Sequence, residues 1–222
     1  MNKPKLALVK TSLSDQLIKI ILERINVSHY PPGSRIDIEE LKKEFGVSHI
    51  PIRDALHKLS EQGLVTIKPR VGYFSVRFKP EEIEDLFEVR TLLELSSIGK
   101  GIKRINKEAL ESLKREYLEL KKLSNTKNID VQRFFDLSEI LHKDIIIQCS
   151  DSPLIENIYT GLINKIRISS RIVYLPKDDI DEHLLIIQSL IEENAVSARR
   201  HLKDHLNAAK NRALKEVSSA LG

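Results

Sequence analysis

Two short helical patterns separated by a tight turn constrain the first third of this 222-residue chain more than any other feature. The first pattern starts at Asp37, a good N-cap residue, and stops at Gly46. The second starts at Ser48, another favoured N-cap residue, and stops at Gly63. The second helix has apolar positions at helical spacing, which predict a core-facing side: Ile52, Ala55, Leu56 and Leu59. Two helices joined in this way predict a helix-turn-helix.

The segments on either side extend this unit. A helical stripe begins at Leu13, and the segments LVTIK, PRVG and YFSVR after Gly63 predict a strand, a turn and a second strand. Three helices followed by a hairpin make residues 13–77 a winged helix-turn-helix domain. Residues 1–12 are expected to form a basic N-terminal tail.

The rest of the chain has the pattern of a helical bundle. The chain has no tryptophan and only 5% aromatic residues, fewer than a β-rich fold usually uses. The expected fold class is therefore mostly α, with the N-terminal winged helix-turn-helix and a C-terminal all-α helical bundle over 80–217. Its long helical stripes are expected at 80–102, 106–124, 130–149, 152–173, 178–193 and 195–217.

The scarcity of cysteine and the lack of long apolar segments predict the cellular compartment of the protein. A single cysteine, Cys149, rules out an internal disulfide and suits a reducing interior. No run of about eighteen apolar residues predicts a membrane span, and the N-terminal segment MNKPKLALVK lacks the apolar core and cleavage site of a signal peptide. We therefore expect a cytoplasmic protein without a membrane partner.

Positive charge concentrates in the N-terminal domain. Residues 1–78 contain 13 Lys and Arg against 8 Asp and Glu, and the remainder contains 23 against 24. In a helix-turn-helix the second helix enters the major groove of DNA, where an arginine can fork onto guanine or a phosphate. The alternative is an ordinary charged surface on a small helical domain. The candidate DNA-binding residues lie in and around this helix and on the hairpin: Arg35, Ser48, His49, Ile50, Arg53, His57, Lys68, Arg70 and Gly72.

The segment PPGSRIDIEELKKEFGVSHIPIRDALHKLSEQGLVTIKPRVGYFSV resembles the winged helix of the GntR family of bacterial transcription regulators. The resemblance covers about residues 13–77 and implies binding to a double-stranded DNA operator. Arg53 matches the family, whereas His49 and Glu39 stand where many members have arginine. The resemblance therefore implies that base preference differs from that of the usual members and depends more on Arg53.

Three histidines are expected to point into the bundle from three different helices. His142, His183 and His205 each lie in line with apolar residues of their own helix. A single inward histidine is usually an ordinary core residue, but three in one bundle form the donor set of a metal site.

The segment LFEVRTLLE resembles the entry to the FCD effector domain of FadR-type regulators, and the resemblance extends through residues 80–217. It implies a small-molecule effector, such as a small acid, with Arg90 binding its carboxylate; the alternative for Arg90 is a surface or structural ion pair with Glu94, four residues later. Ser138 and Arg167 are further candidate effector-binding residues, and Arg167 lies on a helix that could line the same cavity or a surface or subunit interface. Many such domains hold a divalent metal ion on three histidines and an aspartate. Ligand-relieved repression is the commoner mode of action.

One departure from this family bears on the metal. Ser138 occupies the position of the family aspartate, four residues before His142. Glu139 could take its place if the helix shifts slightly. Two outcomes stay open: a divalent ion (zinc, nickel or manganese) with a position free for an acidic effector, or no metal, with the histidines acting as ordinary pocket donors.

These observations predict a non-enzymatic DNA-binding transcription regulator. A homodimer is expected because one recognition helix reads only a half-site and operators of this kind are usually two-fold. Two alternatives remain at this point: a metal-dependent hydrolase that uses the histidines, and a non-catalytic module whose winged helix binds protein.

Overall fold

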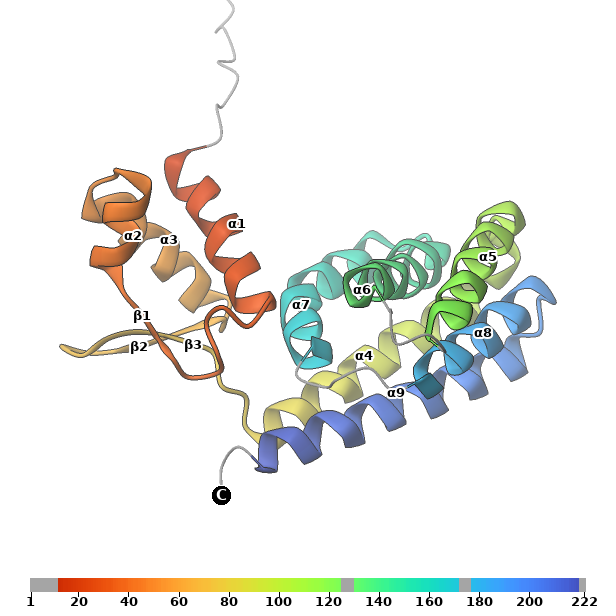
Figure 1. The fold of residues 1–222 in the computed structure, drawn as a ribbon. Coiled ribbons are helices and arrows are strands. Elements are labelled where there is room, and N and C mark those ends of the chain that lie inside the picture. The colour runs from red at the N-terminus through yellow and green to blue at the C-terminus, as the bar shows by residue number, and fades with distance from the viewer. Residues whose placement is uncertain (1–11, 125–129, 172–176, 220–222) are drawn as a thin grey trace, which may run out of the picture. The chain divides into compact units, whose positions relative to one another are not determined.

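The computed structural model describes residues 12–124, 130–171 and 177–219 (Figure 1). The expected tail over residues 1–12 thus falls almost entirely outside the described residues. The chain divides into two compact units, Met1–Phe78 and Lys79–Gly222, here called the N-terminal and the C-terminal unit.

The N-terminal unit contains three helices whose ends follow from local capping. Helix α1 (Leu13–Asn26) begins at Ser12, which forms a reciprocal capping box with Asp15. Helix α2 (Ile38–Phe45) is capped by the side chain of Asp37 and ends at Gly46 in the left-handed conformation (φ 63°). Helix α3 (His49–Glu61) has Ser48 at its N-cap position. The expected side-chain cap is wrong, because the Ser48 hydroxyl makes no hydrogen bond to the helix.

The hairpin forms as expected but gains a third strand. Strands β2 (Val65–Lys68) and β3 (Gly72–Ser75) pair antiparallel, with Lys68 opposite Gly72. Strand β1 (Arg35–Ile36) pairs with the other edge of β3, which gives the sheet order β1-β3-β2. A two-residue strand is too short for its alternation to be recognised in sequence.

The core of the N-terminal unit forms where α1 and α2 pack on α3. The expected core-facing side of α3 is confirmed, since its four apolar residues are completely buried. They pack in a core that also contains Leu17, Ile21, Ile25, Leu41 and Leu64. The burial of these side chains fixes the orientation of α3 in the unit and leaves its opposite face exposed.

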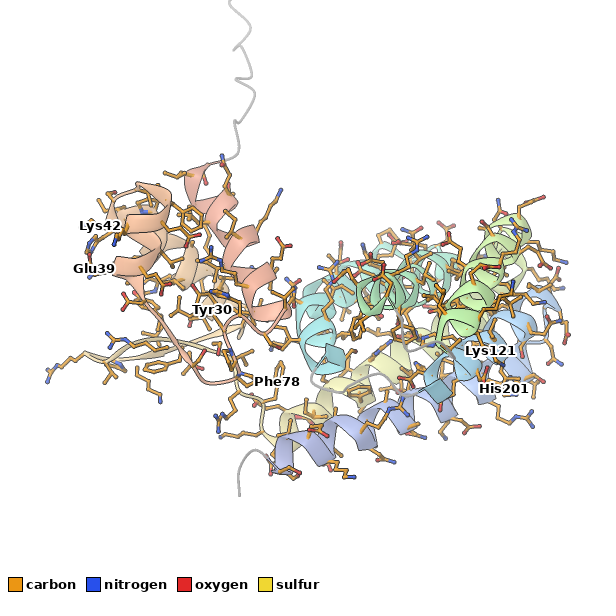
Figure 2. The ribbon with its side chains drawn as sticks, viewed as in Figure 1. Tyr30, Glu39, Lys42, Phe78, Lys121 and His201 are labelled. Carbon is orange, nitrogen blue, oxygen red and sulfur yellow. The ribbon has the colours of Figure 1, made fainter. Side chains whose placement is uncertain are left out.

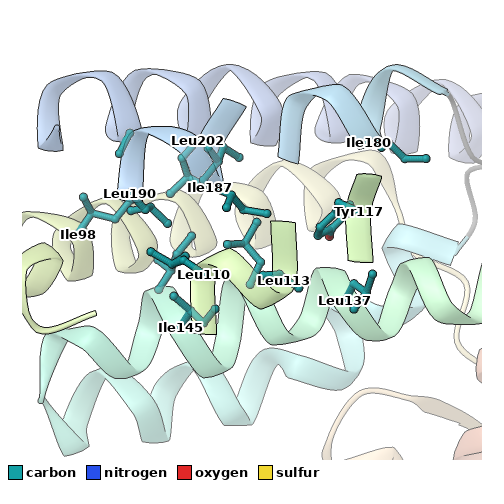
Figure 3. Close-up of a cluster of buried hydrophobic side chains, with 14 of the residues drawn as sticks. Ile98, Leu110, Leu113, Tyr117, Leu137, Ile145, Ile180, Ile187, Leu190 and Leu202 are labelled. Carbon is teal, nitrogen blue, oxygen red and sulfur yellow. The ribbon is translucent and has the colours of Figure 1, made fainter. Parts of the chain in front are cut away.

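The C-terminal unit is a bundle of helices around a second core. Helices α4 and α9 lie side by side, α8 packs on α9, and α5 packs on α8 (Figure 1). Figure 3 shows part of the core, where Leu113, Leu137 and Tyr117 pack with residues of α8. The helices are α4 (Pro80–Gly101), α5 (Lys107–Ser124), α6 (Val131–Glu139), α7 (Pro153–Arg171), α8 (Lys177–Ile191) and α9 (Ala195–Ser219), with a 3-10 turn η1 (Ile102–Arg104).

The single helix expected over 130–149 is wrong in type. After α6 the chain continues as a π-helix, η2 (Ile140–Ile147), and as a 3-10 turn, η3 (Gln148–Ser150). A π-helix has wider turns than an α-helix, so it turns more neighbouring side chains toward the core. An α-helical stripe would also place Leu141, His142, Ile145 and Ile146 on one side, but the wider turns bring Ile147 to the buried side as well.

A close backbone contact holds the end of α4 against η3. A Cβ atom on Gly101 would lie 1.6 Å from the carbonyl oxygen of Cys149, so only glycine fits. The guanidinium of Arg104 donates to the carbonyl oxygens of Cys149 and Ser150 at 3.0 Å each. None of the described helices combines the length and apolar character needed to cross a bilayer.

Candidate functional site

The face of α3 opposite the core carries side chains that reach neighbouring elements. The Nε2 atom of His49 lies 2.9 Å from Oε1 of Glu39, at the start of α2. Figure 2 shows Glu39 close to Lys42, whose Nζ lies 3.5 Å from the other carboxylate oxygen. The Nε2 atom of His57 lies 3.2 Å from the hydroxyl oxygen of Tyr73 in β3. These contacts therefore connect α3 both to α2 and to the hairpin of β2 and β3.

A surface hollow of about 410 Å³ separates the start of α3 from the hairpin. Four cationic side chains line it against two carboxylates. Arg70, at the hairpin turn, adopts a left-handed conformation (φ 63°), and Gly72 has φ 142°. A concave surface with this balance of charge suits a polyanion. The sequence-predicted DNA-binding residues that line it are Arg35, His49, Arg53, Lys68, Arg70 and Gly72, while Ser48, Ile50 and His57 lie elsewhere on and beside α3.

In the C-terminal unit the three predicted histidines come together. His142, His183 and His205 are at most 5% exposed, and one nitrogen of each lies within 4.8 Å of the others. The Nε2 atoms of His142 and His183 are 3.3 Å apart. The ring of His183 also stacks on Tyr117, with centroids 5.1 Å apart and planes 14° apart.

Each imidazole uses its Nδ1 atom away from the cluster. The Nδ1 atom of His142 donates to Oε2 of Glu94 at 2.6 Å, and that of His183 donates to the carbonyl oxygen of Asp179 at 2.6 Å. The Nδ1 atom of His205 lies 2.7 Å from Oε2 of Glu182. Because these partners are acceptors, each Nε2 atom is left with a lone pair, as metal-binding histidines require.

Glu94 is the centre of a buried polar network. Its carboxylate accepts hydrogen bonds from Nε of Arg90 at 2.7 Å, from the hydroxyl of Tyr159 at 3.1 Å and from His142. Burial raises the pKa of Glu94, but His142 and Arg90 outweigh this effect and lower its pKa to about 2. The Arg90–Glu94 pair is thus ionised and buried, not a surface pair.

The histidines themselves are held in the neutral form. Burial lowers the pKa of His183 well below 6.5, and the neighbouring rings of His205 and His142 lower it further. The pKa of His205 is likewise well below 6.5, first because of burial and then because of His142. Two neutral Nε2 atoms 3.3 Å apart have no hydrogen to share, and a bound cation would remove the repulsion between their lone pairs. The donor set therefore fits a divalent metal ion.

A small cavity of about 40 Å³ adjoins the cluster. The hydroxyl of Ser138 lies 3.4 Å from Nε2 of His183, so Ser138 faces the cluster as expected. The cavity is lined by polar residues and by a wall of aromatic and small residues: Arg90, Ser138, Ser170, Asp179, His183, His205 and Arg212, with Phe87, Phe134, Phe135 and Ala209.

Glu139, the possible substitute ligand, does not join the histidine cluster in this structure. Its two carboxylate oxygens accept from Nε and Nη2 of Arg167 at 2.6 and 2.5 Å, so an ion pair holds the carboxylate away from the histidines. Arg167, a candidate effector-binding residue, is engaged in the same pair. A second grouping, of Asp179, Glu182 and His205, also has its carboxylates paired, since Arg212 binds both of them.

Sequence reasoning missed the groups that orient the histidines. Glu94 stands one helical turn after Arg90, which favours a pair between these two residues, but it lies 48 residues before His142. Glu182 immediately precedes His183 but serves His205 instead. The i, i+4 spacing of Arg90 and Glu94 predicts their pairing, but only the tertiary structure brings the carboxylates of Glu94 and Glu182 to the imidazole rings.

Comparison with known proteins gives matches over both units. The family model described as bacterial regulatory proteins, gntR family, matches residues 13–74, and the FCD domain model matches residues 85–208. The HTH-type transcriptional regulator YdhC of Bacillus subtilis (strain 168) is 25% identical over 183 residues, 80% of each chain. The HTH-type transcriptional repressor RspR of Escherichia coli (strain K12) is 24% identical, covering 87% of this chain and 86% of its own.

The fold also matches that of solved structures. A GntR-type regulator from Rhodococcus sp. RHA1 aligns with a TM-score of 0.76 at 18% identity, over 91% of this chain and 97% of the other. The matched families are regulators, which contradicts the hydrolase alternative, and the gntR match favours DNA over protein as the partner of the winged helix.

Proposed function

The chain belongs to the GntR family of bacterial regulatory proteins, carries an FCD domain and is a DNA-binding transcription regulator; from this premise we propose that a small acidic effector, bound beside the three histidines, controls its affinity for an operator. The effector favours one arrangement of two winged helices over another and so changes DNA affinity by the coupling free energy. The observation that carries this proposal is the convergence of three neutral Nε2 donors beside a cavity.

The winged helix supplies the DNA-binding half of the mechanism. Helix α3 enters the major groove, where Arg53 forks onto a guanine. Lys68 and Arg70 on the hairpin and Arg35 beside it contact phosphates, and the backbone at Gly72 approaches the DNA closely. The excess of cations around the hollow supports this assignment.

The histidine cluster supplies the effector half. His142, His183 and His205 would hold a divalent ion, and imidazole donors suit zinc or nickel better than manganese. When bound, such an ion acts as a Lewis acid that attracts a carboxylate. Ser138 provides a neutral hydroxyl in place of an anionic ligand, so a carboxylate effector adds the missing negative charge. The buried arginine Arg90 lines the same cavity and favours an anion.

A homodimer completes the proposal. Exposed aliphatic side chains occur on α4 and α7, which pack against each other in the C-terminal unit. Leu92 is 63% exposed and Leu154 is 69% exposed, and Val89 and Ile158 lie one turn from them. Covering such side chains with a second copy removes apolar surface from water and pairs two recognition helices for a two-fold operator.

Substitution of Arg53 tests the DNA-binding assignment. We expect Arg53→Ala to weaken binding to a selected operator by about 1–3 kcal/mol and to relax the preference at one base pair. Arg115→Ala removes the same charge from an exposed position on α5 and serves as the control. Binding is measured by gel shift at two salt concentrations, and undiminished affinity of Arg53→Ala argues against the assignment of α3.

A further inference from the structure

The outer face of α3 has two neighbouring side chains that the N-terminal unit itself does not use. Arg53 makes no side-chain hydrogen bond or ion pair within the part of the chain that the structure describes, and Ile50 precedes it by three positions. Other outward side chains of α3 are engaged within the unit, namely those of His49, His57 and Lys58. Ile50 and Arg53 are therefore free to contact another molecule, as is the exposed Asp54 that follows Arg53.

The exposure of Ile50 has no explanation in the fold. Its side chain is 71% exposed, whereas Ile52, two positions later, is completely buried. A β-branched residue is also a weaker helix former than alanine or a long polar residue, so helix propensity does not account for it. An aliphatic group left in water at this position gains free energy only when a partner covers it.

Arg53, which follows Ile50 by three positions on α3, indicates the chemistry of that partner. Arg53 lines the hollow together with Arg35, Lys68 and Arg70, a cationic surface suited to the phosphates of DNA. The major groove offers one apolar group to such a helix, the C5-methyl group of thymine. An aliphatic side chain beside an arginine thus matches a thymine beside a guanine.

We propose that Ile50 packs against the C5-methyl group of a thymine next to the base pair read by Arg53. The proposal rests on the proposed function, in which the N-terminal residues of α3 face base edges. Side chains three residues apart on a recognition helix reach successive base pairs, as in zinc-finger helices. Each half-site then contains a thymine whose methyl group contributes to affinity.

Uracil substitution isolates that methyl group. The full-length protein first selects duplexes from a random-sequence pool, and each thymine of the selected half-site is then replaced in turn by uracil, which lacks only the methyl. We expect one replacement per half-site to weaken binding about fourfold, the factor that burial of one methyl-sized group gives. Fluorescence anisotropy measures the affinities.

Two variants separate this contact from other effects. Ile50→Ala is expected to bind the thymine and uracil duplexes equally, and its melting temperature should match that of the wild type. Val27→Ala shortens an aliphatic side chain that is 55% exposed after α1, and it should keep the fourfold preference. Equal binding of both duplexes by the wild type, or a preference retained by Ile50→Ala, overturns the proposal. A pool that yields no preferred sequence overturns sequence-specific DNA reading itself, and this proposal with it.

Discussion

Nδ1 of His142 lies 2.6 Å from the carboxylate of Glu94, a residue that is completely buried and lies on a different helix. The carboxylate fixes which nitrogen of His142 faces the cluster. We expect Glu94→Gln to weaken zinc binding by about 10- to 100-fold, as loss of a partner behind a metal ligand usually does. Competition with a chromophoric chelator measures the affinity.

The same substitution has a second effect that does not involve metal. It leaves the guanidinium of Arg90 buried without a counter-charge, so we expect the metal-free protein to lose about 3–5 kcal/mol of stability. Glu182→Gln is the comparison, because Glu182 is partly exposed and its loss leaves no buried charge. If both variants bind zinc as tightly as the wild type, the carboxylates have no role in orienting the rings.

Ser138→Asp is expected to change stability in opposite directions with and without metal. With zinc, the added carboxylate supplies an anionic ligand beside His183, and affinity should rise by about tenfold or more. Without zinc, the arginines that line the cavity, Arg90 and Arg212, are already paired with Glu94 and Asp179, so the added buried carboxylate lowers the melting temperature. Thermal unfolding with zinc and with chelator measures both effects, and Ser170→Asp on the cavity wall is the control. A rise in zinc affinity as large in the control would show that any carboxylate in the cavity suffices.

The metal-free protein should lose stability in mild acid. The pKa values of His183 and His205 lie well below 6.5 in the folded state, whereas in the unfolded chain they are near 6.5. The unfolded state therefore binds more protons below about pH 6.5, and the free energy of unfolding falls as the pH decreases, by about 1.4 kcal/mol per pH unit for each histidine.

Urea unfolding between pH 5 and 8 in the presence of chelator measures this slope. Above pH 7 these histidines are neutral in both states and contribute no slope. His183→Gln removes one titrating group and should reduce the slope below pH 6.5. A free energy of unfolding that is constant from pH 5 to 7 contradicts the burial of neutral imidazoles.

Two glycines should respond to alanine in opposite ways. Gly101→Ala places a methyl group against the backbone of Cys149, and we expect a loss of about 3 kcal/mol. Gly161 lies on the exposed side of α7 with nothing within 4 Å of an added Cβ, so Gly161→Ala should gain roughly 0.5–1 kcal/mol. Urea unfolding gives both values. Equal changes for the two variants would refute the close contact between α4 and η3.

Local pattern predicts much of this molecule. The spacing of Ile52, Leu56 and Leu59 placed α3 with its core side inward, because helical periodicity directly reports which side is buried. The same argument brought three histidines from three helices into one cluster. Where a residue faces along one helix is a local property, and the sequence contains it.

Contacts between distant segments and changes of helix type are not local. Sequence spacing predicts neither the contact of Glu94 with His142 nor the contact of Glu139 with Arg167, because both contacts depend on how the helices cross. The start of η2 has no sequence signal either, because its isoleucines suit an α-helix or a π-helix equally well. The sequence already predicts that Ile50 lies outside the core-facing side of α3, but only the structure shows that no other segment of the unit covers it.

The π-helix η2 also affects how such a chain can change in length. An α-helix accommodates one inserted residue by widening a turn, and η2 has such widened turns between Ser138 and Cys149. Loss of one residue there can be absorbed by relaxation toward an α-helix. The same loss in the middle of α4 would turn everything after it by about 100° and take Arg90 and Glu94 out of register. Descendants of this chain can therefore gain or lose a residue beside the histidine cluster more easily than on the helix that supports it.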